Sequence, residues 1–428
     1  MENRQITAPT FRKAFRFWLK LGFISFGGPA GQIAVMQKEL VEKRGWIEQE
    51  DFLHALNFCM LLPGPEAQQL ATYIGWRLHG IRGGIVAGAL FVVPSIFLLL
   101  ILSYIYAAYG NVPQISAILD GFKAVVVAIV VEAVIKIAKK SFKSIWHILI
   151  AVSAFAAIFL FHIPFPLIIV GAAILGFISS KFQVSGFRFA VRDAKSIEKP
   201  ETGNLKPETW NHFLKVLAAC FMLWLLPLLA VLFAFGRESY AVKTYLFFTQ
   251  SAFVTFGGAY AVLAYVNQAV VSANWITAAQ SVDGLALAET TPGPLIMVLQ
   301  FIGFMTGWNN TDGHSQLFYA VVCGLLATYA TFLPSFLFIF AGASYIEKLR
   351  RNRKLSSALA GVMAAVVGVI LNLALTFGAT VLFPQMQIDI FAVLLALISF
   401  LALYFLKADV LLIVVGGGLC GLIKYLLT

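Results

Sequence analysis

Long apolar runs, separated by short polar segments, occupy most of the chain. The run from Gly84 to Tyr106 is typical, because it is continuous and long enough to cross a bilayer as one helix. The runs do not alternate in hydrophobicity as the strands of a membrane barrel do. We expect crossings at residues 84–107, 115–138, 146–162, 164–180, 213–235, 317–341, 356–377, 388–406 and 409–427. The pattern predicts an all-α polytopic membrane protein.

Helix-breaking residues interrupt this pattern at four places. FGG occurs at Phe26–Gly28 and at Phe256–Gly258, while LPGP occupies Leu62–Pro65 and TPGP occupies Thr291–Pro294. Irregular backbone survives at membrane depth only inside protein or beside a water-filled cavity. We therefore predict broken or re-entrant hairpins that begin and end on one side of the membrane. If they span it fully instead, the number of crossings rises to about 13.

The broken segments recur in the same order, which indicates an internal repeat. The second FGG follows the first by about 230 residues, and TPGP follows LPGP at nearly the same interval. Further along, VVPS at Val92–Ser95 matches FLPS at Phe332–Ser335. The helix after VVPS, which begins near Asp120, likewise has a counterpart near Ala360. The chain is predicted to contain two copies of one membrane unit.

Basic residues fall in opposite loops of the two copies. The first copy carries Lys139, Lys140 and Lys143 in a loop whose counterpart, residues 377–387, has no Lys or Arg. The bias reverses in another pair of equivalent loops. Residues 107–116 of the first copy are neutral, whereas their counterpart in the second copy, residues 348–354, is basic. Lys and Arg mark cytoplasmic loops, so the copies should lie in opposite orientations. This is an inverted-topology repeat, the plan of many secondary transporters.

These observations predict the following division of the chain. An amphipathic segment at residues 1–20 lies in the cytoplasmic interface or acts as a plain juxtamembrane anchor. The first repeat occupies 21–180, a cytoplasmic polar linker 181–212, an unpaired helix that inverts the topology 213–235, and the second repeat 244–428. The N-terminus is then cytoplasmic and the C-terminus external.

The paired breaks predict a binding site for an anion. In each PGP motif the second proline suits the first position of a new helix, with glycine as its N-cap. Free N–H groups and the positive end of the helix dipole would then point into the membrane from both copies. The alternative is that these residues only permit close packing and kinks. The predicted substrate-binding residues are Phe26, Gly27, Gly28, Pro29, Pro63, Gly64, Pro65, Gln68, Gln69, Phe256, Gly257, Gly258, Thr290, Thr291, Pro292, Gly293, Pro294, Gln300 and Lys123.

Two carboxyl groups flank the breaks and are candidates for proton coupling. Glu66 follows LPGP, and Glu289 precedes TPGP. A carboxylate repels a bound anion unless it is protonated, and carboxyl groups inside membranes often carry protons. Glu66 could instead complement the dipole of its own helix. Similarly, the amides and hydroxyls near the breaks could satisfy freed backbone carbonyls rather than a ligand.

Composition and charge narrow the range of functions. The chain is 60% hydrophobic and 12% charged, with a net charge of +11. Lys and Arg lie in short loops, which topology explains better than a nucleic-acid partner does. The four cysteines stand singly in apolar runs, so we expect no metal site, no redox centre, no cofactor and no enzymatic activity.

The motifs FGGPAGQIA, LLPGPEAQQLATYIG and TTPGPLIMVLQFIGF resemble those of the chromate ion transporter family in its long two-domain form. The resemblance implies export of chromate across the cytoplasmic membrane, driven by the proton motive force, with sulfate as the natural competitor. Gln32 stands where family members often carry His, and Met60 and Leu61 stand where they often carry Gln. The alternatives are a transporter of sulfate or another oxyanion and, in a different class, a lipid-phosphate flippase. The expected partners are the oxyanion and the lipid bilayer, and a homodimer is the assembly that we consider.

Overall fold

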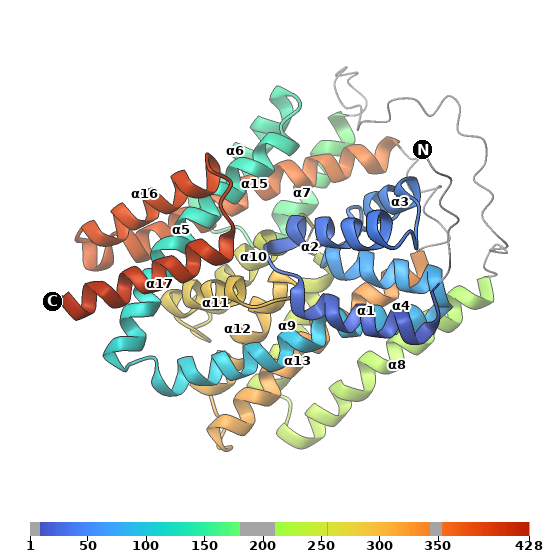
Figure 1. Ribbon diagram of the computed structural model, residues 1–428, viewed down its shortest axis with the longest axis horizontal. Coiled ribbons are helices and arrows are strands. Elements are labelled where there is room, and N and C mark those ends of the chain that lie inside the picture. Colours follow the sequence, from blue (N-terminus) through green and yellow to red (C-terminus); the bar gives the residue numbers. More distant parts are fainter. Residues whose placement is uncertain (1–8, 180–209, 255, 343–352, 428) are drawn as a thin grey trace.

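The computed structural model describes residues 9–179, 210–254, 256–342 and 353–427. These residues form sixteen α-helices and no strand, which confirms the all-α prediction (Figure 1). The predicted linker lies almost entirely outside the described residues, as does most of the basic segment 348–354. Each of the predicted crossings falls on a helix. By length and composition, α4, α8, α13, α15 and α17 are each able to span a membrane.

The two halves contain matching series of helices. The first half comprises α1 (Phe11–Ile24), α2 (Gly28–Gln37), α3 (Gln49–Cys59), α4 (Glu66–Tyr109), α5 (Pro113–Ser141), α6 (Ile145–Phe159) and α7 (Phe165–Ser179). After α8 (Trp210–Phe235), the second half comprises α9 (Tyr240–Val254), α10 (Ala259–Ser272), α11 (Ala278–Thr290), α12 (Val298–Asn309), α13 (Gln316–Gly342), α15 (Arg353–Leu382), α16 (Ile390–Tyr404) and α17 (Val410–Leu427). Helix α4 corresponds to α12 and α13 together, because His79 and Gly80 leave helical geometry and divide it into a hairpin.

The long helices of one half pack against the last helices of the other. Helix α5 lies against α16 and α17, and α15 lies against α6 and α7 (Figure 1). Equivalent glycines make these contacts close. A Cβ at Gly121 of α5 would lie 2.0 Å from the Gly417 carbonyl oxygen, and one at Gly361 of α15 would lie 2.3 Å from the Ala172 carbonyl oxygen. Small residues permit such close approach of membrane helices. This exchange is the packing expected of two copies of one unit, while their opposite orientation stays a prediction.

Helix α1 joins the first half more closely than a separate surface segment would. It runs without interruption across the boundary expected at residue 20 and packs against α4, as α9 packs against α13. Trp18 and Leu21 are buried in this contact, whereas Phe11 and Phe15 are exposed. The repeating unit therefore includes the helix that precedes each FGG motif.

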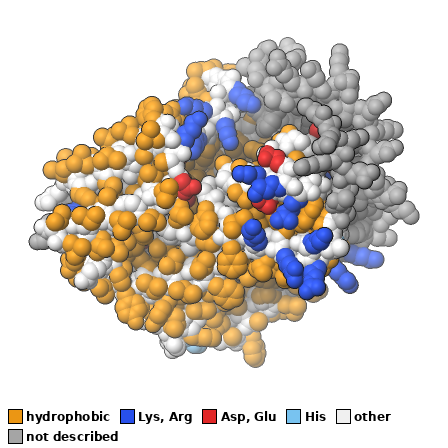
Figure 2. Space-filling model, in the orientation of Figure 1, with side chains coloured by type: hydrophobic (Ala, Val, Ile, Leu, Met, Phe, Trp, Pro, Cys, Tyr) orange, Lys and Arg blue, Asp and Glu red, His pale blue; other side chains and the backbone are white. Residues whose placement is uncertain are grey.

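The face of the molecule in Figure 2 is mostly apolar, and most of its basic side chains lie in one region. Figure 2 shows hydrophobic side chains over α16 and α17, whereas Lys and Arg collect over α1 to α3. Exposed apolar side chains such as Phe233 and Leu412 suit contact with lipid. One ion pair in the basic region joins Arg77 of α4 to Asp51 of α3 at 2.7 Å.

Candidate anion site

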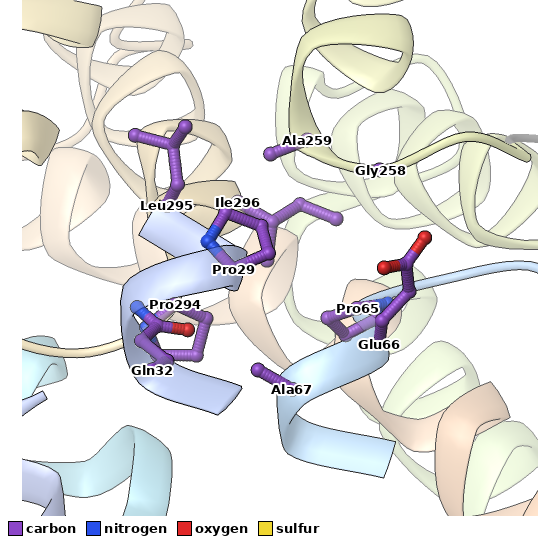
Figure 3. A pocket seen from close by; sticks show the side chains of 10 residues that line it. All are labelled: Pro29, Gln32, Pro65, Glu66, Ala67, Gly258, Ala259, Pro294, Leu295 and Ile296. Atoms are coloured by element: carbon purple, nitrogen blue, oxygen red, sulfur yellow. The ribbon is translucent and has the colours of Figure 1, made fainter. Parts of the chain in front are cut away.

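The starts of four helical segments meet around one pocket between the two halves (Figure 3). Each half contributes the start that follows its FGG motif and the start that follows its PGP motif. The pocket is lined by Pro29 and Gln32 of α2, Pro65, Glu66 and Ala67 at the start of α4, Gly258 and Ala259 at the start of α10, and Pro294, Leu295 and Ile296 before α12. The sequence predicted helix starts at the PGP motifs and placed the FGG residues in the same site; in the structure, helices also begin at or directly after each FGG motif and line this pocket.

These helix starts leave backbone donors available. None of the four has a side chain that caps its first N–H groups. Uncapped N–H groups and the positive end of the helix dipole together favour an anion. The start before α12 is a short 3-10 turn, Leu295–Met297, that leads directly into the α-helix.

The glycines of the breaks all adopt positive φ, in matching pairs. Gly64 has φ +106° and Gly293 has φ +102°, and the two glycines of each FGG motif are likewise positive. Other residues rarely adopt these angles. The expected caps were wrong by one residue, because Pro65 and Pro294 are themselves the N-caps. Their ψ angles of 100° and 130° are extended, so helical geometry begins only at the next residue.

The TPGP loop of the second half is held by residues of the first half. The Gly293 N–H donates to the Ser25 carbonyl oxygen at 2.7 Å, and the Ser95 hydroxyl donates to the Pro292 carbonyl oxygen at 2.5 Å. Gln32 donates its amide N–H to the Gly293 carbonyl oxygen. All three partners are buried. The wall of the pocket is thus fixed by contacts across the repeat boundary.

The LPGP loop of the first half is held in a different way. Gln69, five residues on from Gly64, donates to the Pro63 carbonyl oxygen at 2.7 Å. Ser335, the counterpart of Ser95, lies close to Gly64, but its buried hydroxyl has no hydrogen-bond partner. The two loops are therefore related in sequence and backbone shape but not in their anchoring.

Most of the other predicted polar residues bind backbone carbonyls. Thr290 and Thr291 donate to carbonyls of their own helix at 2.7 and 2.9 Å. Gln300 donates to the Ile96 carbonyl oxygen at 2.8 Å, across the repeat boundary. Gln68 donates to Thr72 at 3.1 Å and leaves its buried amide oxygen without a partner. In this conformation three of these four residues donate to backbone carbonyls. Phe26 and Phe256 flank the breaks and do not line the pocket.

The charged candidates occupy three separate places. Glu66 lines the pocket. Glu289 lies outside its lining and accepts a hydrogen bond from Tyr260 at 2.9 Å. Lys123 also lies outside and pairs with Asp120 at 3.0 Å and with Asp283 at 3.7 Å.

Sequence reasoning missed three residues that the structure makes prominent: Gln32 and Ser95, which hold the TPGP loop, and Asp283, which is buried beside Lys123. The only sequence signal for Asp283 was a lone carboxylate in a hydrophobic segment. Within the described ranges, no group of three or more His, Cys, Asp or Glu side chains is arranged to hold a metal ion.

Comparisons with known proteins give relatives that match nearly the whole chain. The chain is 29% identical to a chromate transport protein of Pseudomonas aeruginosa, over 96% of this chain and 92% of that protein. It is 28% identical to a chromate transport protein of Cupriavidus metallidurans, over 98% and 95% of the two chains. It is also 25% identical to an uncharacterized transporter of Methanocaldococcus jannaschii, over 97% and 94%. No solved structure matches. The sequence pattern of the chromate transporter family matches residues 12–177 and 242–422, so the chain belongs to that family.

Proposed function

We propose that this protein exports chromate across the cytoplasmic membrane, with the anion held where the four helix starts meet. The observation that carries the proposal is this convergence, two starts from each half around one pocket. Relatives named chromate transport proteins match nearly the full chain and supply the choice of anion. A tetrahedral oxyanion presents four oxygens, which suits N–H donors arriving from several directions.

The electrostatics of the pocket favour an anion. Each helix start carries roughly +0.5 of an elementary charge. Four such ends together carry a positive charge of about +2, which balances the charge of one dianion. The lining itself contains no lysine or arginine. Backbone donors hold an anion without the strong charge of a cationic side chain, so the anion can also leave.

The membrane potential favours the proposed direction. An inside-negative potential of 100 mV contributes about 2.3 kcal/mol for each elementary charge moved across. Outward movement of a dianion therefore gains about 4–5 kcal/mol per 100 mV, before any proton is coupled to it.

Glu66 is the proposed proton site within the pocket. Its carboxylate faces the same space as the anion, and two anions there repel unless one is neutralised. A dianion should therefore bind best when Glu66 is protonated. We assign Glu289 no contact with the anion, because its carboxylate is directed to Tyr260.

The decisive experiment measures labelled chromate and sulfate uptake into everted membrane vesicles, with and without an imposed proton gradient. We expect chromate uptake that sulfate inhibits. Sulfate uptake alone would favour the oxyanion alternative, and binding of a lipid phosphate without transport of either anion would favour a flippase. Absence of transport of both anions under every gradient would refute the export proposal.

A further inference from the structure

Asp283 is a buried carboxylate that lies away from the anion pocket. It lies in the middle of α11 (Ala278–Thr290), and its side chain is 3% exposed. The TPGP loop that lines the pocket follows α11 directly. Asp283 is therefore placed where its charge can affect the position of the loop without touching the anion.

Side chains from two first-half helices face Asp283. Tyr106 of α4 donates its hydroxyl to Oδ2 at 2.9 Å. Lys123 of α5 lies 3.7 Å from Oδ1, beyond ordinary hydrogen-bond distance, and Oδ1 has no hydrogen-bond partner. The negative charge of Asp120 on α5 also repels the ionised form of this carboxyl group. Phe301 of α12 packs edge-on against Tyr106.

This arrangement lets Asp283 change its charge at limited cost. An ionised carboxylate with one buried, unpaired oxygen is poorly compensated, so addition of a proton relieves desolvation. Lys123 does not then become an isolated buried cation, because Asp120 is its nearer partner, at 3.0 Å. Protonation forms an O–H bond on Asp283 and breaks only its ion pair with Lys123.

The three charged side chains also form a graded path from the surface. Their exposed fractions are 59% for Asp120, 22% for Lys123 and 3% for Asp283. The path opens near the loop between α4 and α5, which has no Lys or Arg and is therefore expected on the external side. Protons from the external side are those that a proton gradient supplies.

We propose that Asp283 is a second proton-binding site, reached from the external side past Asp120 and Lys123, that couples the proton gradient to movement of the TPGP hairpin. Ionised Asp283 joins α11 to α5 through its ion pair with Lys123, and protonation of Asp283 breaks this ion pair. This inference rests on the proposed transport of chromate. It differs from the role of Glu66, because Asp283 should affect the response to the gradient and not the affinity for the anion.

The test uses purified full-length protein in liposomes. The external side of the protein faces the liposome lumen. Two rates are compared: chromate–chromate exchange without a gradient, and chromate uptake driven by an acidic lumen. In Asp283→Asn we expect the stimulation by the gradient to fall to about onefold, with exchange and its KM within about twofold of wild type. Asp389→Asn is the matched control, since Asn can still cap α16, and it should respond to the gradient as wild type does.

Two further variants separate coupling from folding. Lys123→Gln combined with Asp283→Asn removes both charges and leaves no unpaired cation, so it should exchange chromate without responding to the gradient. Asp283→Glu keeps a titratable carboxyl group and should retain a response. A normal gradient response in Asp283→Asn overturns the inference, and so does loss of exchange in both the single and the double variant. If the wild-type protein exchanges chromate but does not respond to the gradient, the inference is overturned and chromate transport still stands. If the wild-type protein moves neither chromate nor sulfate, the proposed function is overturned as well.

Discussion

Substitution of Gly293 by alanine should damage transport more than the equivalent change at Gly64. A Cβ at Gly293 would lie 1.7 Å from Ser95 Oγ, so the hydroxyl must leave the Pro292 carbonyl. A Cβ at Gly64 would meet its nearest neighbours at 3.1 Å, which small shifts relieve. Both changes also place a side chain at positive φ, which costs about 1–3 kcal/mol.

The difference between the two variants can be estimated from the lost contact. A buried hydrogen bond whose acceptor is left unsatisfied costs about 1–3 kcal/mol. If that cost falls on the transport-competent arrangement, Gly293→Ala should be about 5- to 140-fold less active than Gly64→Ala, since 1.4 kcal/mol is a factor of ten. Gly236→Ala is the matched control for backbone strain alone, because Gly236 also has positive φ, lies between α8 and α9 away from the pocket, and a Cβ there meets nothing within 4 Å.

The assay is initial chromate uptake into everted vesicles, normalised to the amount of each variant in the membrane. All three variants should insert normally, because each change affects a single loop. Adding Ser95→Ala to Gly293→Ala removes the clashing oxygen but leaves the Pro292 carbonyl without its donor, so the double variant should be no less active than Gly293→Ala. Equal activity of Gly293→Ala and Gly236→Ala would refute the reasoning, as would wild-type transport by both PGP variants.

Three further predictions address the pocket, its anchoring and the topology. Glu66→Gln removes the competing charge and should lower the apparent KM for chromate at alkaline pH severalfold, with a smaller effect at acidic pH; an unchanged pH profile would exclude Glu66 as the proton site. Ser95→Ala should lower the free energy of unfolding by about 1 kcal/mol, measured by thermal unfolding in detergent, whereas Ser335→Ala should change it little, because the Ser335 hydroxyl has no partner. Cysteines introduced at Asn111 and Lys143 into a cysteine-free protein should react with an impermeant thiol reagent from opposite sides of the membrane; labelling of both from one side would contradict the predicted orientation.

The sequence predicted the helices and the breaks because their signals are local. Apolar length predicts a crossing, and Gly and Pro mark a break wherever they occur. The meeting of the breaks was expected from the predicted repeat, because inverted copies would bring equivalent segments toward one midplane. The anchoring of the loops could not be predicted in this way. Ser95 and Pro292 lie far apart in the chain, and only the packing of α4 against the second half brings them together.

Asp283 shows a second reason for incomplete prediction. Lys123 is one turn from Asp120, a spacing that favours an ion pair on one helix face, and the structure contains this pair. The same lysine also faces Asp283 from another helix, and no spacing along the chain encodes that contact. The polar residues near the breaks were ambiguous for a different reason, because one amide can bind either an anion or a carbonyl.

The exchange of helices between the halves has a consequence for how the protein assembles. Because α5 needs α16 and α17, and α15 needs α6 and α7, each half alone would present to lipid the glycine-lined faces that its partner covers. A chain severed within residues 181–209 should therefore yield two fragments that are each degraded when made separately. Made together in one cell, the fragments should interlock and restore chromate uptake, because the contacts that join them do not depend on the covalent link.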